Sequence, residues 1–163
     1  MTEEPEYRVP DYIGILTGWR AWRIGDSGGG WVLRGLFADV EWPPREEMRA
    51  TCYEQLRLSP LGMSVHTAPG VGCTCGIHAL KRTNDFAFRE RLFYTSLEEV
   101  VAFGHVSLWG RVIEGSRGFR VEIAYPRDLI IVSRTARTVR RCEILARELA
   151  KAYGVDVSVG RWL

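Results

Sequence analysis

Alternation of apolar and polar positions is the clearest pattern in this chain. Apolar side chains recur at every second position in residues 105–114, and the alternation resumes over 119–123 after a turn at 115–118. This period of two predicts a β-hairpin that ends at Pro126. A dense apolar and aromatic stretch at 14–24, a Gly-rich turn at 26–30 and a further apolar run at 31–37 predict a second hairpin.

A different spacing marks the C-terminal part of the chain. Apolar residues with a period of 3.6 predict one long helix from Thr135 to Tyr153, with Gly154 placed as its C-terminal cap. The face expected to be buried comprises Val139, Cys142, Leu145, Leu149 and Tyr153. Residues 129–132 suit either a brief strand or the lead into this helix, and 155–159 suit a last strand.

Two shorter helices are also predicted. Pro43 and Pro44 suit the first turn of a helix that would deliver Cys52. A hydroxyl at Ser96 and a carboxylate at Glu99 form a capping box, which predicts a helix running to about Phe103.

These elements predict an α+β fold, in which one long C-terminal helix packs on an antiparallel sheet of hairpins. Residues 1–11 are acidic, contain two prolines and read as a flexible lead-in. Residues 12–163 then form a single domain, with a zinc-stapled loop insertion at about 50–80. A chain of 163 residues is long enough to bury one sizeable core.

The composition indicates where the protein is located in the cell, but it says little about function. No apolar run approaches the roughly 18 residues that a membrane span needs. The N-terminus has no apolar signal region, which predicts a cytoplasmic protein whose thiols stay free or bind metal. The net charge of +2 is too small to imply a nucleic-acid partner by itself.

Candidate metal ligands are concentrated in residues 51–78. Cys52, His66, Cys73 and Cys75 are separated by 13, 6 and 1 residues. Thiolate sulfur and neutral imidazole nitrogen are the donors of closed, structural zinc sites such as Cys3His. Glycines flank the Cys73–Cys75 turn and permit the unusual backbone angles of a ligand-bearing loop. His78 is an alternative to His66.

Other interpretations of these cysteines stay open. The C-x-C spacing is less usual in zinc sites than C-x2-C. A disulfide is one alternative, and a reactive Cys75 thiol beside His78 is another, although no third orienting group stands at a readable spacing. Cys142 fits the pattern of a small, buried, free cysteine.

Two stretches of the chain carry a family resemblance. They are HTAPGVGCTCGIHALK at 66–81, preceded by Trp-Pro-Pro and a Cys, and the LWG to AYP block at 108–126. Over residues 19–155 the chain resembles a family of small, uncharacterised (hypothetical) bacterial proteins. The resemblance implies that Cys52, His66, Cys73 and Cys75 are the ligand set. It argues against His78, because the family mostly has Tyr there, and it implies no activity.

Function is predicted from charge and from the closed ligand set. The helix carries Arg137, Arg140, Arg141 and Arg147, which form either a solvated face or a contact for phosphate or an acidic partner. We therefore expect a binding module for nucleic acid or a protein partner, with no catalytic residue assigned. The alternative is an enzyme that uses the Cys75 thiol or an open zinc with Glu54 as base. Binding is favoured because four protein ligands would close the site.

Overall fold

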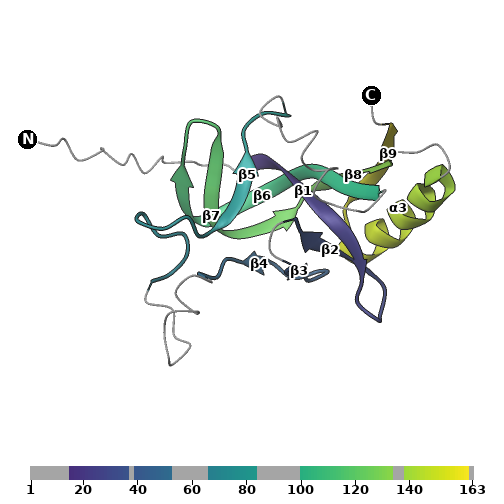
Figure 1. The fold of residues 1–163 in the computed structure, drawn as a ribbon, viewed down its shortest axis with the longest axis horizontal. Coiled ribbons are helices and arrows are strands. Elements are labelled where there is room, and N and C mark those ends of the chain that lie inside the picture. The colour runs from purple at the N-terminus through teal and green to yellow at the C-terminus, as the bar shows by residue number, and fades with distance from the viewer. Residues whose placement is uncertain (1–14, 37–38, 53–65, 84–99, 134–137, 162–163) are drawn as a thin grey trace, which may run out of the picture.

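The structure is a computed structural model that describes residues 15–36, 39–52, 66–83, 100–133 and 138–161. Nine strands and one helix lie in these ranges (Figure 1). The strands are β1 (Leu16–Asp26), β2 (Trp31–Gly35), β3 (Glu41–Trp42), β4 (Met48–Arg49), β5 (Ile77–Leu80), β6 (Val100–Glu114), β7 (Gly118–Pro126), β8 (Asp128–Ser133) and β9 (Asp156–Arg161). The helix is α3 (Val139–Tyr153).

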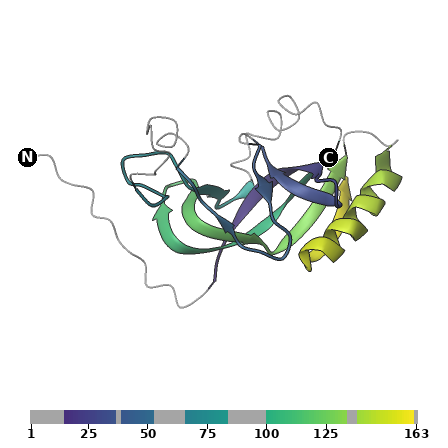
Figure 2. The ribbon, with the colours of Figure 1, turned by 90° about the horizontal axis from the view of Figure 1, so that it is seen from below.

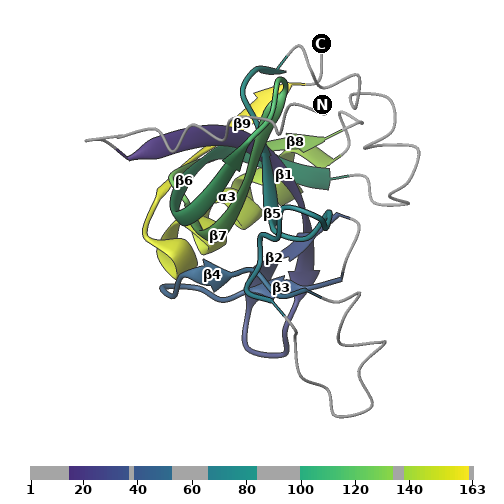
Figure 3. The same cartoon turned by 90° about the vertical axis from the view of Figure 1, so that its left-hand side faces the viewer.

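Four of the strands close on themselves. β1 pairs with β6 along most of its length, from Leu16 opposite Leu108 to Arg23 opposite Val101. β6 pairs with β7, β7 with β5, and β5 returns to β1 through Trp19 opposite Leu80. Figure 3 looks along the long axis of the molecule and shows these strands arranged in a ring.

This closure makes the predicted α+β class wrong. Within the described residues strands account for 53% and helix for 15%, and the sheet is a closed β-barrel with a single helix. Both predicted hairpins form, as the β1–β2 and β6–β7 pairs. What the alternation did not indicate is that β1 would also pair with β6, because period-two patterns specify faces of a strand and not its partner.

Glycine permits the close approach that completes the ring. A Cβ atom on Gly18 of β1 would lie 2.8 Å from the Ala79 Cβ of β5. A Cβ atom on Gly118 of β7 would lie 2.2 Å from the Ala79 carbonyl oxygen. Strand β5 therefore fits between β1 and β7 only because both neighbours lack a side chain beside Ala79.

The helix closes one end of the barrel core (Figure 2). Its buried side chains are Cys142, Leu145, Ala146, Leu149 and Tyr153, and Gly154 caps it in the left-handed conformation as predicted. Val139 was expected on this face, but it is 46% exposed. It is the first residue of the helix and lies beyond the edge of the core. The first three residues of the predicted helix, 135–137, lie outside the described residues.

The two short helices were predicted wrongly where the structure describes them. Residues 44–46 form a turn, and Met48–Arg49 forms strand β4. Residues 100–103 belong to β6, paired with both β1 and β8, so sheet pairing overrides the local capping signal there. Residues 96–99 lie outside the described residues. The last strand forms as β9, parallel to β8.

Candidate metal centre

The candidate ligands are held by strands β4 and β5, which follow each other along the same edge of β7. Met48 and Arg49 pair with Ala124 and Ile123, and Ile77 pairs with Val121. Between these pairings the Ala50 amide donates to the Glu122 carbonyl oxygen at 2.7 Å. The chain thus leaves this edge after Ala50 and rejoins it at Ile77, and the cysteines and histidine lie in the intervening segment.

Four side chains of this segment converge. The Sγ atoms of Cys52, Cys73 and Cys75 and a ring nitrogen of His66 all lie within 4.8 Å of one another. The Cys52 and Cys73 sulfurs are 3.7 Å apart, and His66 Nε2 is 3.1 Å from Cys75 Sγ. Bonds of about 2.3 Å at tetrahedral angles would place two zinc-bound sulfurs about 3.8 Å apart, so the donor set fits such a metal.

Backbone hydrogen bonds and a glycine hold these donor atoms in place. The Gly70 amide donates to Cys75 Sγ at 3.2 Å, and the Cys73 amide donates to the Gly70 carbonyl oxygen at 3.3 Å. A Cβ atom on Gly70 would lie 2.6 Å from His66 Nε2. Any other residue at position 70 would therefore displace the imidazole from the cluster.

Arg120 holds the segment to the barrel. Its Nη1 donates to the carbonyl oxygens of Gly70, at 3.2 Å, and Cys75, at 3.0 Å, and also to that of Cys73. It extends from β7, where it pairs with His78 of β5. A Cys3His zinc site carries a net charge of −1, which this guanidinium would offset. Sequence reasoning assigned Arg120 no role, although it lies in the LWG to AYP block.

The proton affinity of Cys73 argues against a free thiolate at this position. The Cys75 backbone amide lowers the pKa of Cys73, but desolvation and the neighbouring Cys75 and Cys52 thiols outweigh it and raise that pKa to about 11. Near neutral pH the Cys73 sulfur would keep its proton unless a metal displaced it. A nucleophilic thiol needs the opposite shift.

His78 does not join the cluster. Its Nε2 lies 2.9 Å from the Thr74 carbonyl oxygen, so that nitrogen donates its proton there. Burial, followed by the nearby positive charges of Arg20 and Arg120, lowers the pKa of His78. The structure therefore brings His66 to the sulfurs and leaves no Cys75–His78 pair. No disulfide links any of the four cysteines, all of which lie in the described ranges.

The predicted partner-binding arginines lie elsewhere. Arg140, Arg141 and Arg147 are exposed on α3, at the end of the molecule opposite the ligand segment, which is teal in Figure 1. Arg137 and the candidate base Glu54 lie outside the described residues. No helix in the described ranges is long and apolar enough to cross a membrane.

Comparison with known proteins adds no relative. No protein-family model, curated protein or solved structure matches this chain. The resemblance to small bacterial proteins therefore stays a prediction.

Proposed function

We propose that this chain is a zinc-stabilised binding module of the cytoplasm, in which the metal is structural. The observation that carries the proposal is the convergence of three thiols and one imidazole within 4.8 Å. Zinc is the metal of choice because soft sulfur donors with imidazole in a tetrahedral set are typical of it. The resemblance to small bacterial proteins supports the same ligand set.

A structural role is favoured over a catalytic one because the protein supplies four donors. A catalytic zinc keeps a coordination position for water. Here Cys52 is 1% exposed, and the other three ligands are partly buried. The enzyme alternative would require one of the four to leave the metal during the reaction.

Metal content tests this proposal directly. Purified protein should contain about one zinc per chain by elemental analysis, and Cys73→Ala and His66→Ala should each lose most of it. Cys142→Ala is the matched control, because Cys142 is a fully buried residue of α3 that does not belong to the cluster, so its replacement should leave the zinc content unchanged. Wild-type protein without zinc, or equal zinc in Cys73→Ala and Cys142→Ala, would sink the proposal.

We place the macromolecular contact on the exposed side of α3. Arg140, Arg141 and Arg147 project from it, and none of them has an ion-pair partner among the described residues. Such a face suits nucleic acid or an acidic protein. Nucleic-acid affinity would fall steeply with salt, because each neutralised phosphate releases counterions.

A gel-shift series at several salt concentrations decides between the two partners. Arg140 and Arg147 are seven residues apart and lie on one face of the helix. Replacing both with Gln should reduce the slope of log affinity against log salt concentration by the amount expected for about two phosphate contacts. Zinc content should not change. No shift at micromolar protein and low salt would leave an acidic protein as the expected partner.

A further inference from the structure

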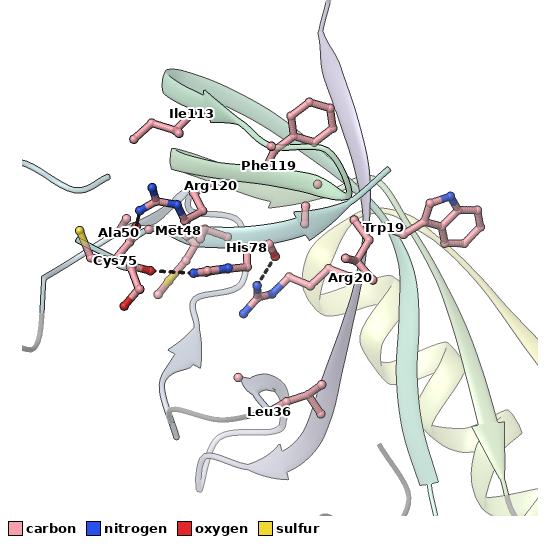
Figure 4. Close-up of a pocket in the computed structure, with 18 of the residues that line it drawn as sticks. Trp19, Arg20, Leu36, Met48, Ala50, Cys75, His78, Ile113, Phe119 and Arg120 are labelled. Carbon is pink, nitrogen blue, oxygen red and sulfur yellow. Dashed lines mark hydrogen bonds between the residues drawn. The ribbon is translucent and has the colours of Figure 1, made fainter. Parts of the chain in front are cut away.

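A groove of about 850 Å³ runs beside the ligand segment. Figure 4 shows Arg20 of β1, His78 of β5 and Arg120 of β7 along it, with Leu36 on the other side. Its volume lies in the range of small-molecule sites, about 300–1,000 Å³. The groove borders the metal cluster, since Cys73 and Cys75 are among its lining residues, and it contains no residue of α3.

The groove has four positively charged side chains and no carboxylate in its described lining. The four are Arg20, Arg49, Arg117 and Arg120. Low-dielectric walls lined by one sign of charge concentrate ligands of the opposite sign. The groove therefore selects for an anion.

Arg20 is the arginine placed to bind it. The guanidinium lies over the Trp42 ring, 5.0 Å from its centroid, and Nη1 donates to the His78 carbonyl oxygen (Figure 4). These contacts fix the plane of the group. Its Nε is buried and has no partner among the described residues. Nε and Nη2 form one edge of the guanidinium, which matches the two oxygens of a carboxylate or phosphate.

Comparison with nearby arginines shows what Arg20 lacks. Arg23 and Arg34 both pair with Asp39, and Arg49 pairs with Glu47. No carboxylate in the described part of the chain pairs with Arg20. A partly buried charge without a partner is costly, and a ligand anion would remove that cost.

Apolar and aromatic side chains form much of the remaining lining, beside polar residues such as Thr51 and Ser116. Leu36, Met48 and Phe119 line it, and the buried Trp42 ring supports the Arg20 guanidinium. Such walls suit a hydrocarbon or aromatic body and not a bare inorganic ion.

We propose that this groove binds a small organic acid, with its carboxylate or phosphate on the Nε–Nη2 edge of Arg20 and its apolar body against Leu36, Met48 and Phe119. The two headgroups share the same oxygen geometry toward a guanidinium. A test with one probe of each kind distinguishes them.

Isothermal titration with 3-phenylpropionate, phenyl phosphate and the neutral 3-phenylpropionamide tests the site. At least one of the two anions should bind, and at least tenfold more tightly than the amide. Arg20→Met, which keeps the apolar stem, should lower anion affinity at least tenfold. Arg20→Lys keeps the positive charge but lacks the planar edge, so its anion affinity should lie between those of the wild type and Arg20→Met. Arg140→Met on α3 is the control and should change affinity less than twofold.

Two results would overturn the proposal: equal binding of the acid and the amide, or undiminished anion binding by Arg20→Met. A second measurement on the wild-type chain covers the case in which Arg20→Met fails to fold. The Arg20 Nε–H resonance should shift on adding the anion and stay in place on adding the amide. If the Arg20 Nε–H resonance does not shift at 10 mM of either anion, the proposed binding site would also be rejected.

Discussion

Arg120 joins the ligand segment, which carries the cysteines and His66, to the barrel through its Nη1 atom. Arg120→Met removes one hydrogen bond from each of three carbonyl groups, those of Gly70, Cys73 and Cys75, and only the bond from the Cys73 amide to Gly70 remains among those described. Groups that orient metal ligands from outside the coordination sphere typically contribute 10- to 100-fold in metal affinity. We expect a zinc affinity lower by about that factor, measured by competition with a chromophoric chelator.

The control for this change is Arg117→Met. Arg117 is exposed in the turn before β7, and its side chain makes no ion pair among the described residues. Equal zinc affinity in the two variants would mean that Arg120 only fills space beside Gly76.

Tyr153 links the helix to the sheet through its hydroxyl. The Leu33 amide donates to this oxygen at 2.8 Å, and the hydroxyl donates to the Trp42 carbonyl at 2.6 Å. Tyr153→Phe leaves both buried groups unpaired, which should lower the free energy of unfolding by about 1–3 kcal/mol. Urea denaturation measures this.

The same hydroxyl predicts a dependence on alkaline pH. Burial raises the pKa of Tyr153 from 10.0 to about 12. Between these values the unfolded phenol loses its proton while the folded one keeps it, so stability should fall as pH rises from 10 to 12. The fall should be smaller in Tyr153→Phe. Parallel curves for the two proteins would contradict the assignment.

Among the elements, α3 gives the sharpest contrast between two apolar residues of one predicted face. Leu145 is 2% exposed and Val139 is 46% exposed. Leu145→Ala should cost about 2–5 kcal/mol of unfolding free energy, the usual range for a core leucine. Val139→Ala should stay within about 0.5 kcal/mol, as surface changes do. Similar costs for both variants would place Val139 in the core after all.

The elements that the sequence predicted correctly are those for which the local pattern of residues decides the conformation. Alternation identified the β6–β7 hairpin, and apolar runs around a Gly-rich turn identified the β1–β2 hairpin. The 3.6-residue spacing identified α3 with its Gly154 cap. Local signals failed for residues 100–103, because pairing of β6 on both edges outweighs a capping box. They also failed at Met48–Arg49, where pairing with β7 decides the conformation.

The metal cluster was predictable because its donor types are chemically rare, so three cysteines and a histidine stand out without knowledge of the fold. The roles of Arg120 and Arg20 could not be predicted, because arginine is common and these roles depend on which strands become neighbours. Arg120 meets the ligand segment only because β5 pairs with β7. Arg20 meets Trp42 only because β1, β2 and β3 are adjacent.

At the scale of the whole molecule, closure of the barrel depends on β5. This strand of four residues is the only described link from β7 back to β1, and its register with β1 consists of Trp19 opposite Leu80. It begins two residues after the candidate ligand Cys75. The metal would therefore hold the strand that completes the ring, and its removal should open the barrel on that side first.

Hydrogen exchange with and without a strong chelator tests this order of opening. After zinc removal the amides of Ile77–Leu80 should exchange at least tenfold faster, because local opening no longer has to break the metal bonds. The amides of Leu129–Val132 should stay protected, since β8 pairs with β6 and β9 and not with β5. Cys73→Ala without chelator should show the same pattern. Protection lost everywhere at once would show that the metal supports the whole fold, and unchanged protection of β5 would show that pairing with β7 alone closes the ring.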